Sequence, residues 1–290
     1  MGERDRVSMA ADLLEWYSGA ARDLPWRRPE AGPWGVLVSE IMLQQTPVAR
    51  VLPAYIAWLQ RWPTPAALAA DSRGEAVRMW GRLGYPRRAL RLHECAVVLV
   101  LRFGGHVPAE VADLIALPGV GPYTARAVAT FAHGRRHAVV DTNVRRVAAR
   151  LAGVALPRTA AADLALVEPL VPAEPATARV FAAAAMELGA LICHAGSPRC
   201  ELCPIAGACA WRQAGGAGPA QSRPRPQGYA GTDRQVRGLL LAVLRDTDGP
   251  VQPAALVAQW SDKVQRDRAL RSLTTDGLVE RRADGTYRLP

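Results

Sequence analysis

The sequence contains no apolar run of about 18 residues, which is the length that a membrane-spanning helix needs. Its polar N-terminus also lacks the pattern of a secretory signal peptide. Phenylalanine, tyrosine and isoleucine are scarce, whereas alanine, leucine and arginine dominate. We therefore expect a cytoplasmic protein that is helical rather than sheet-forming, in a chain long enough for about two domains.

Acidic residues are fewer than basic ones, 26 against 36, so the 290 residues carry a formal net charge of +10. Such an excess suits a polyanionic partner such as nucleic acid. An arginine-rich proteome would produce the same excess, and the charge alone does not decide between the two. Most of the excess lies in residues 1–212, a distribution that decides little on its own.

Cysteine is rare, and four of the five cysteines form one cluster with the spacing Cys193-x6-Cys200-x2-Cys203-x5-Cys209. Without an export signal, clustered cysteines indicate metal ligation rather than disulfides. Four thiolates can hold a [4Fe–4S] cluster. Zinc is the alternative, although zinc sites usually pair two short cysteine motifs across a longer gap.

Two glycines, Gly119 and Gly121, separate two segments with helical patterns of apolar residues. Glycine permits a positive φ and a close approach of the backbone to a ligand, so we expect a helix, a tight turn and a second helix. The backbone N–H groups of Val120, Gly121 and Tyr123 would lie near the positive end of the second helix and could bind a phosphate. An ordinary helical hairpin would give the same glycine pattern.

Residues 33–46 predict a helix with one anomaly, Glu40, which shares an apolar stripe with Val36, Leu37 and Leu43. A carboxyl group that is desolvated in this way has a raised pKa and is protonated near neutral pH. An ion pair with an arginine, or a side chain that reaches water, is the alternative.

Asp141 precedes a predicted helix that begins at Thr142. Aspartate is a favoured N-cap residue, and a capping carboxylate beside a cleft is fixed and ionised. We expect both roles for Asp141.

Four motifs occur in an order that resembles the MutY-type adenine DNA glycosylases of the endonuclease III superfamily. They are Ser39–Thr46, Leu117–Ala125, Asp141 with Asn143, and the cysteine cluster. The resemblance covers about residues 8–212 and implies an all-α, two-lobed helix-hairpin-helix DNA glycosylase fold with a [4Fe–4S] loop. It assigns residues 1–29 and 135–212 to the iron–sulfur domain and residues 30–134 to a six-helix domain. A nucleoid-associated enzyme of base excision repair is implied.

The resemblance also implies roles for individual residues. Glu40 would donate a proton to N7 of an extruded adenine, and Asp141 would stay ionised opposite the positively charged sugar. Asn143 and Tyr123 would orient Asp141 and the sugar. Related lyases carry a lysine at the place of Tyr123, so we predict a monofunctional glycosylase that leaves an abasic site. Other positions match residues around the adenine, the partner base or the DNA: Leu24, Trp26, Arg27, Gln45, Tyr85, Gly119, Val120, Gly121 and Glu187.

The chain departs from the family pattern at two places. Thr142 stands where the family more often has glycine, and Pro86 follows Tyr85 where a second aromatic residue is usual. A T:G mismatch glycosylase, an endonuclease III-like glycosylase and a non-enzymatic iron–sulfur DNA-binding protein are therefore alternatives.

The last part of the sequence differs in composition from the rest. Residues 213–231 are rich in Gly, Ala, Pro, Gln and Ser and predict a linker. Residues 232–290 predict three helices and a hairpin, a small winged-helix-like α+β module that would contact DNA or dock on the catalytic part. They are too short for the domain that reads 8-oxoguanine in MutY-type enzymes, so the chain resembles an actinobacterial-like form without it. We expect a monomer that acts on double-stranded DNA with A:8-oxoguanine or A:G mispairs.

Overall fold

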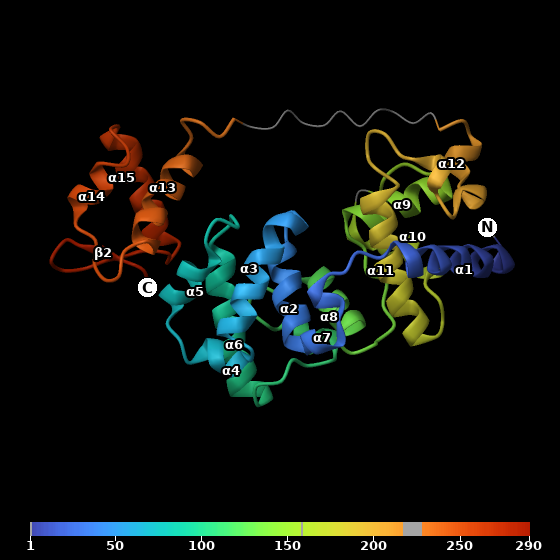
Figure 1. Ribbon diagram of the computed structural model, residues 1–290, viewed down its shortest axis with the longest axis horizontal. Helices are drawn as coiled ribbons and strands as arrows, with labels where there is room; N and C mark the ends of the chain where they lie inside the picture. Colours follow the sequence, from blue (N-terminus) through green and yellow to red (C-terminus); the bar gives the residue numbers. More distant parts are fainter. Residues whose placement is uncertain (1, 158, 217–227) are drawn as a thin grey trace. The chain divides into compact units, whose positions relative to one another are not determined.

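The computed structural model describes residues 2–157, 159–216 and 228–290, and it consists of two compact units. The first unit comprises Met1–Val36, Ala109–Ile115 and Val120–Pro224, and the second comprises Leu37–Pro108, Ala116–Gly119 and Arg225–Pro290. Nearly all regular structure of the described residues is helical, as the composition predicts (Figure 1). In these parts of the chain, no helix is both long enough and apolar enough to cross a membrane.

Among the described residues, seven helices lie wholly in the first unit. They are α1 (Glu3–Ala20), α7 (Val111–Ile115), α8 (Pro122–Phe131), α9 (Thr142–Ala152), α10 (Ala160–Val167) and α11 (Pro175–Leu191), followed by the short α12 (Ala210–Gln213). Short 3₁₀ turns lie at Pro25–Arg27, Pro29–Ala31, Glu168–Leu170, Cys200–Leu202 and Ala206–Ala208. Helix α2 (Gly32–Leu43) begins in the first unit and ends in the second.

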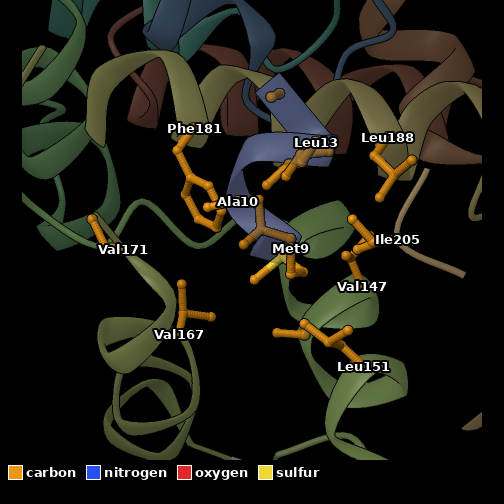
Figure 2. Close-up of a cluster of buried hydrophobic side chains, with 14 of the residues drawn as sticks. Met9, Ala10, Leu13, Val147, Leu151, Val167, Val171, Phe181, Leu188 and Ile205 are labelled. Atoms are coloured by element: carbon orange, nitrogen blue, oxygen red, sulfur yellow. The ribbon is translucent and has the colours of Figure 1, made fainter. Parts of the chain in front are cut away.

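The core of the first unit forms around the apolar face of α1. Figure 2 shows Met9, Ala10 and Leu13 of α1 surrounded by apolar side chains from α9, α10, α11 and the cysteine segment. The surrounding residues include Val147, Leu151, Val167, Val171, Phe181, Leu188 and Ile205. Burying a leucine or phenylalanine stabilises the fold by about 1.5–3 kcal/mol per side chain. Because α1 contributes to this core, the N-terminal segment is fixed against the helices that carry Asp141 and Glu187.

The second unit begins with α3 (Val48–Arg61), α4 (Pro65–Ala69), α5 (Arg73–Trp80) and α6 (Arg87–Phe103). Three buried tryptophans join these helices. The ring of Trp58 lies edge-on to those of Trp62 and Trp80, with centroids 4.6 and 5.7 Å apart. Such aromatic pairs add about 0.5–1.5 kcal/mol beyond the area that they bury. The contacts fix α3 against α5.

The chain ends in the second unit with three helices and a hairpin, in the order that the sequence predicts. They are α13 (Asp233–Arg245), α14 (Pro253–Val257), α15 (Lys263–Thr275), β1 (Glu280–Arg281) and β2 (Tyr287–Arg288). The strands are antiparallel, with Glu280 opposite Arg288 and Arg281 opposite Tyr287. The winged-helix classification and the domain boundaries stay predictions. Of the predicted linker, residues 217–227 lie outside the described residues.

This C-terminal module contacts α5 and α6. Arg245 Nε donates a hydrogen bond to the carbonyl of Val77 at 2.9 Å, and Arg78 Nη2 donates to that of Thr247 at 3.2 Å. A Cβ atom added at Gly74 would lie 2.5 Å from the carbonyl oxygen of Pro290, so the chain end covers α5 closely. These contacts support docking, one of the two roles expected for the module.

Candidate active site

Asp141 is the N-cap of α9, as predicted, and three donors hold its carboxylate. Oδ1 accepts hydrogen bonds from the backbone N–H groups of Asn143 and Val144, at 2.9 and 2.7 Å, and Oδ2 accepts one from Asn143 Nδ2 at 2.9 Å. Burial raises the pKa of Asp141, and the three hydrogen bonds oppose this rise because they favour the ionised form. The side chain is thus half-buried and fixed in one orientation.

Asn143 is itself held by Arg146, a residue that the sequence interpretation missed. Arg146 Nη2 donates to Asn143 Oδ1 at 2.8 Å and to the carbonyl of Gly189 at 2.7 Å, and Nε donates to the carbonyl of Cys193 at 2.7 Å. A Cβ atom at Gly189 would lie 2.6 Å from Asn143 Cβ, so only glycine leaves room for Asn143. Arg146 therefore links Asp141, through Asn143, to α11 and the start of the cysteine segment.

Glu187 of α11 is fully buried and ion-paired with two arginines. Arg22 Nε and Nη2 donate to its two oxygens at 2.7 and 2.8 Å, and Arg27 Nη2 donates at 2.8 Å. Burial alone raises the pKa of Glu187, but the hydrogen bonds from Arg22 and Arg27 outweigh it and lower the pKa to about 2. The structure thus brings Arg27 and Glu187 together, as the resemblance implies for residues of one pocket, and adds Arg22, which the sequence did not reveal.

Leu24 and Trp26 lie between these two arginines in the sequence, and both are buried. Pro25–Arg27 is a 3₁₀ turn, and Glu187 binds Arg27 at its end and Arg22 three residues before its start. Arg27 also lies over the ring of Tyr17 at 5.7 Å from its centroid. The turn is therefore rigidly attached to α1 and α11.

Tyr123 lies in the first turn of α8 and is half-buried. Its ring packs against an apolar cluster of Ala127, Val139 and Ala182. Because Val139 precedes Asp141 by two residues in an extended segment, this packing ties α8 to the chain that presents Asp141.

Glu40 lies inside α2, in the second unit, and its side chain is buried, with a residue exposure of 8%. Its helix neighbours Val36, Leu37 and Ile41 are also buried. The apolar pattern that singled out Glu40 therefore predicted its burial correctly. Asp141, Asn143, Tyr123 and Glu187 belong to the first unit.

The glycine turn differs in one respect from the sequence prediction. Gly119 has φ +82°, as expected, but Gly121 has φ −95° and is the extended N-cap residue of α8, so the idea that both glycines take a positive φ is wrong. A Cβ atom at Gly119 would lie 3.0 Å from Arg91 Cβ, whereas one at Gly121 would meet no atom within 4 Å. Val120 is buried and Gly121 is exposed, so the open N-terminus of α8 is reached at Gly121. Gln44 Nε2 donates to the carbonyl of Gly119 at 3.4 Å.

Gln45 and Tyr85 are exposed on two loops of the second unit, residues 44–47 and 81–86. Among the described residues other than glycine, only these two have a positive φ, 54° for Gln45 and 47° for Tyr85. Each is therefore held in a conformation that its side chain disfavours.

The four clustered cysteines line one pocket in the first unit. The other lining residues are Arg150, Ile192, Pro198, Ala206, Trp211 and Arg212. Arg150 Nη1 donates to Cys193 Sγ at 3.2 Å and to the carbonyl of His194 at 2.7 Å, and its guanidinium lies 4.7 Å from the ring centroid of Trp211. Within the part of the chain that the structure describes, no group of three or more His, Cys, Asp or Glu side chains is arranged to hold a metal ion.

Known proteins that are similar to this chain include DNA glycosylases and endonuclease III. Residues 38–169 match the family model described as HhH-GPD superfamily base excision DNA repair protein. An adenine DNA glycosylase of Mycolicibacterium smegmatis is 56% identical over 280 residues, which is 96% of this chain and 94% of that protein. A solved thermostable thymine-DNA glycosylase has a TM-score of 0.67 at 29% identity and covers 73% of this chain and 98% of its own. A trapped endonuclease III–DNA covalent intermediate has a TM-score of 0.64 at 22% identity, over 75% of this chain and all of that one, and shows the shared fold.

Proposed function

Because the chain belongs to the adenine DNA glycosylases of the HhH-GPD superfamily of base excision DNA repair proteins, we propose that it removes adenine paired with 8-oxoguanine or guanine. The structural observation that carries the proposal is the contrast between two acidic residues. Glu40 is buried in an apolar helix, whereas Asp141 is held by three hydrogen-bond donors at a helix N-terminus. Burial favours the neutral form of a carboxyl group, and donated hydrogen bonds favour the ionised form. Glycosidases use such a pair as proton donor and stabilising carboxylate.

The reaction starts with an adenine that is extruded from the duplex. Glu40 donates its proton to N7, and the bond between N9 and C1′ of the sugar breaks with its electron pair going to the base. The carboxylate of Asp141 stabilises the positive charge that develops at C1′. Water then adds to C1′ and transfers a proton to the Glu40 carboxylate, which restores the acid, so the products are free adenine and an abasic site.

Asn143, Arg146 and Tyr123 support this step by holding Asp141 in place. Asn143 donates to the carboxylate, Arg146 holds Asn143, and Tyr123 packs on the segment before Asp141. A carboxylate that is already oriented needs no reorganisation when charge develops, which is the main source of electrostatic stabilisation.

We propose that the enzyme does not cut the DNA strand. Strand cutting by related lyases needs a lysine amine that forms a Schiff base with the sugar. This chain carries Tyr123 at the matching place, and its sequence contains a single lysine, Lys263, which lies on α15 of the C-terminal module.

The endonuclease III-like family commonly has a [4Fe–4S] cluster, and we propose that Cys193, Cys200, Cys203 and Cys209 hold one here. The four cysteines line one pocket, and Arg150 places a positive charge at Cys193 Sγ, which suits thiolate ligands. When bound, the cluster would crosslink four points of the cysteine segment, which follows α11. Arg146 and Arg150 already tie this segment to α9 through its backbone carbonyls.

The test is a set of duplexes with A:8-oxoguanine, A:G, A:T and T:G pairs, each incubated with the full-length protein. We expect free adenine from the first two, strand cutting only after alkali, and no covalent adduct with borohydride. Release of thymine would instead favour the T:G activity named for the similar thymine-DNA glycosylase structure. Tight DNA binding without release of any base would contradict the proposal.

A further inference from the structure

Gln45 and Tyr85, the two described non-glycine residues with a positive φ, lie in loops from different parts of the second unit. Gln45 belongs to residues 44–47, between α2 and α3, which we name the Gln45 loop. Tyr85 belongs to residues 81–86, between α5 and α6, which we name the Tyr85 loop. A left-handed conformation costs on the order of 1–3 kcal/mol for a residue that is not glycine, and it persists only where the surroundings enforce it. Strained residues of this kind concentrate at functional sites.

One side chain, Arg88, enforces the conformation of both loops. Arg88 lies in the first turn of α6, and its Nη1 donates to the carbonyls of Ile41, Met42 and Gln44 at 2.9, 3.0 and 2.6 Å. Its Nη2 donates to Thr46 Oγ1 at 2.9 Å and to the carbonyl of Gly84 at 3.1 Å. Gln45 is thus held through both of its chain neighbours.

The same guanidinium holds the aromatic residue of the other loop. It lies 5.4 Å from the ring centroid of Tyr85 and 5.2 Å from that of Trp80, and Trp80 Nε1 donates to the carbonyl of Gly84 at 2.9 Å. Tyr85 itself remains 58% exposed. Arg88 therefore fixes the backbone of the loop and leaves the tyrosine available for contact.

The chemistry of these contacts requires arginine. The acceptors include carbonyls from the last turn of α2 and the loop after it, which have no partner within the helix and attract a cation. The two terminal nitrogens of a planar guanidinium carry four N–H donors and reach acceptors on two loops at once, whereas a lysine ammonium has three donors on one nitrogen.

We propose that Arg88 is a positioning residue that joins the Gln45 and Tyr85 loops into one preformed probe of the DNA base stack. The proposal rests on the proposed function, because the target is the duplex in which a mispaired adenine must be extruded. Since Arg88 holds the backbone of both loops before DNA binds, the entropic cost of ordering this backbone is absent from the binding step. The probe favours mispairs because a weakly stacked pair is cheaper to separate.

The first test needs no DNA. Hydrogen exchange of the free protein is compared for wild type, Arg88→Lys and the matched control Arg73→Lys, whose arginine forms an exposed ion pair with Glu94 on the same unit. We expect faster exchange in both loops for Arg88→Lys only, with the rest of the second unit unchanged. Unchanged exchange in both loops, or a change in one loop alone, would overturn the proposal.

The second test measures adenine release in single turnovers. A misplacement of about 1 Å costs on the order of a hundredfold in rate, so we expect a loss of this size for Arg88→Lys on an A:8-oxoguanine duplex. The loss should shrink on a duplex whose adenine faces an abasic site, because that base needs less help to unstack. Equal losses on the two substrates would show a general effect on folding or catalysis and contradict the proposal.

If the proposed function is wrong, the results differ from those expected if only the role of Arg88 is wrong. Wild type would then release no adenine from any duplex, while the exchange data would still report whether Arg88 couples the two loops. Arg88→Lys with wild-type exchange and wild-type release would leave no role for Arg88.

Discussion

The two units prepare their acidic residues in opposite ways. In the first unit, Glu187 and Asp141 are surrounded by donors, and arginines hold both acids or the residues next to them. In the second unit, Glu40 is part of an apolar helix, and the nearby arginine Arg88 binds backbone carbonyls. Hydrogen bonds favour the ionised form of both acids in the first unit. They lower the pKa of Glu187 to about 2, whereas at Asp141 burial outweighs them and raises the pKa. Glu40 instead lies among apolar side chains, the setting in which we propose that it serves as proton donor.

The largest expected effect on the rate of adenine release comes from changing Glu40, the proposed proton donor in the second unit. Glu40→Gln keeps the size and polarity of the side chain but removes the proton. General acid catalysis contributes about 10²–10⁴-fold, so we expect a rate loss in that range in single-turnover release of adenine. The exposed Glu15→Gln is the control and should keep the wild-type rate. A Glu40→Gln enzyme with near-wild-type activity would remove Glu40 from the mechanism.

The next largest effect is on stability, and it tests whether the ion pairs of Glu187 stabilise the first unit. The double change Arg22→Met and Arg27→Met removes both guanidinium partners of the buried Glu187 and leaves it the backbone N–H of residue 22 as a donor. We expect a loss of about 3–5 kcal/mol in unfolding free energy. The control Arg28→Met breaks an exposed pair with Asp23 and should cost far less. Denaturant unfolding measures both. A small loss in the double variant would mean that Glu187 is not held by these arginines.

The ion pairs of Glu187 with Arg22 and Arg27 also predict that the protein loses stability in acid. The pKa of Glu187 is lowered from its ordinary 4.5 to about 2, so the folded form binds its proton less readily than the unfolded chain. The stabilising contribution is complete above pH 4.5 and is lost as the pH falls toward 2. Glu187→Gln should flatten this part of the stability curve. An unchanged curve would contradict the lowered pKa.

A similar effect on rate is expected for Asp141→Asn, which removes the charge but keeps a capping acceptor. Loss of one preorganised electrostatic contact costs about 10²–10³-fold in kcat. Because asparagine is also a good N-cap, the melting temperature should hardly change. A parallel measurement on the exposed Asp113→Asn serves as the control.

The smallest effect concerns the docked C-terminal module. Gly74→Val would force a side chain against Leu289 and Pro290, and overpacking of this kind costs about 1–3 kcal/mol. Removing Pro290 in the same variant should recover part of the stability, because it relieves the closest contact. Thermal unfolding of the single and double variants checks this, and equal stability would mean that the chain end does not press on α5.

Local sequence patterns predicted several parts of the site. Glu40 stood out because its helix neighbours are apolar, and Asp141 because it precedes a helix start, and both features depend on residues within one or two helical turns. The glycines at positions 119 and 121 predicted a tight turn that permits a positive φ, and Gly119 has one.

The arginines that hold the site could not be found in this way. Arg22 binds Glu187, 165 residues away, and Arg88 binds carbonyls 44–47 residues away. In a sequence so rich in arginine, no periodicity marks the few that have buried acceptors. The extended conformation of Gly121 was also missed, because a glycine pattern does not say which glycine takes the positive φ.

The most direct test of the two-acid account is the pH dependence of adenine release in single turnovers. We predict a bell-shaped profile, in which the rate falls at high pH as Glu40 loses its proton. It also falls at low pH as Asp141, whose pKa is raised above 3.8, gains one. Asp141→Asn should remove the acid limb and Glu40→Gln the alkaline limb. A profile that keeps both limbs in the two variants would contradict the assignment of a neutral Glu40 and an ionised Asp141.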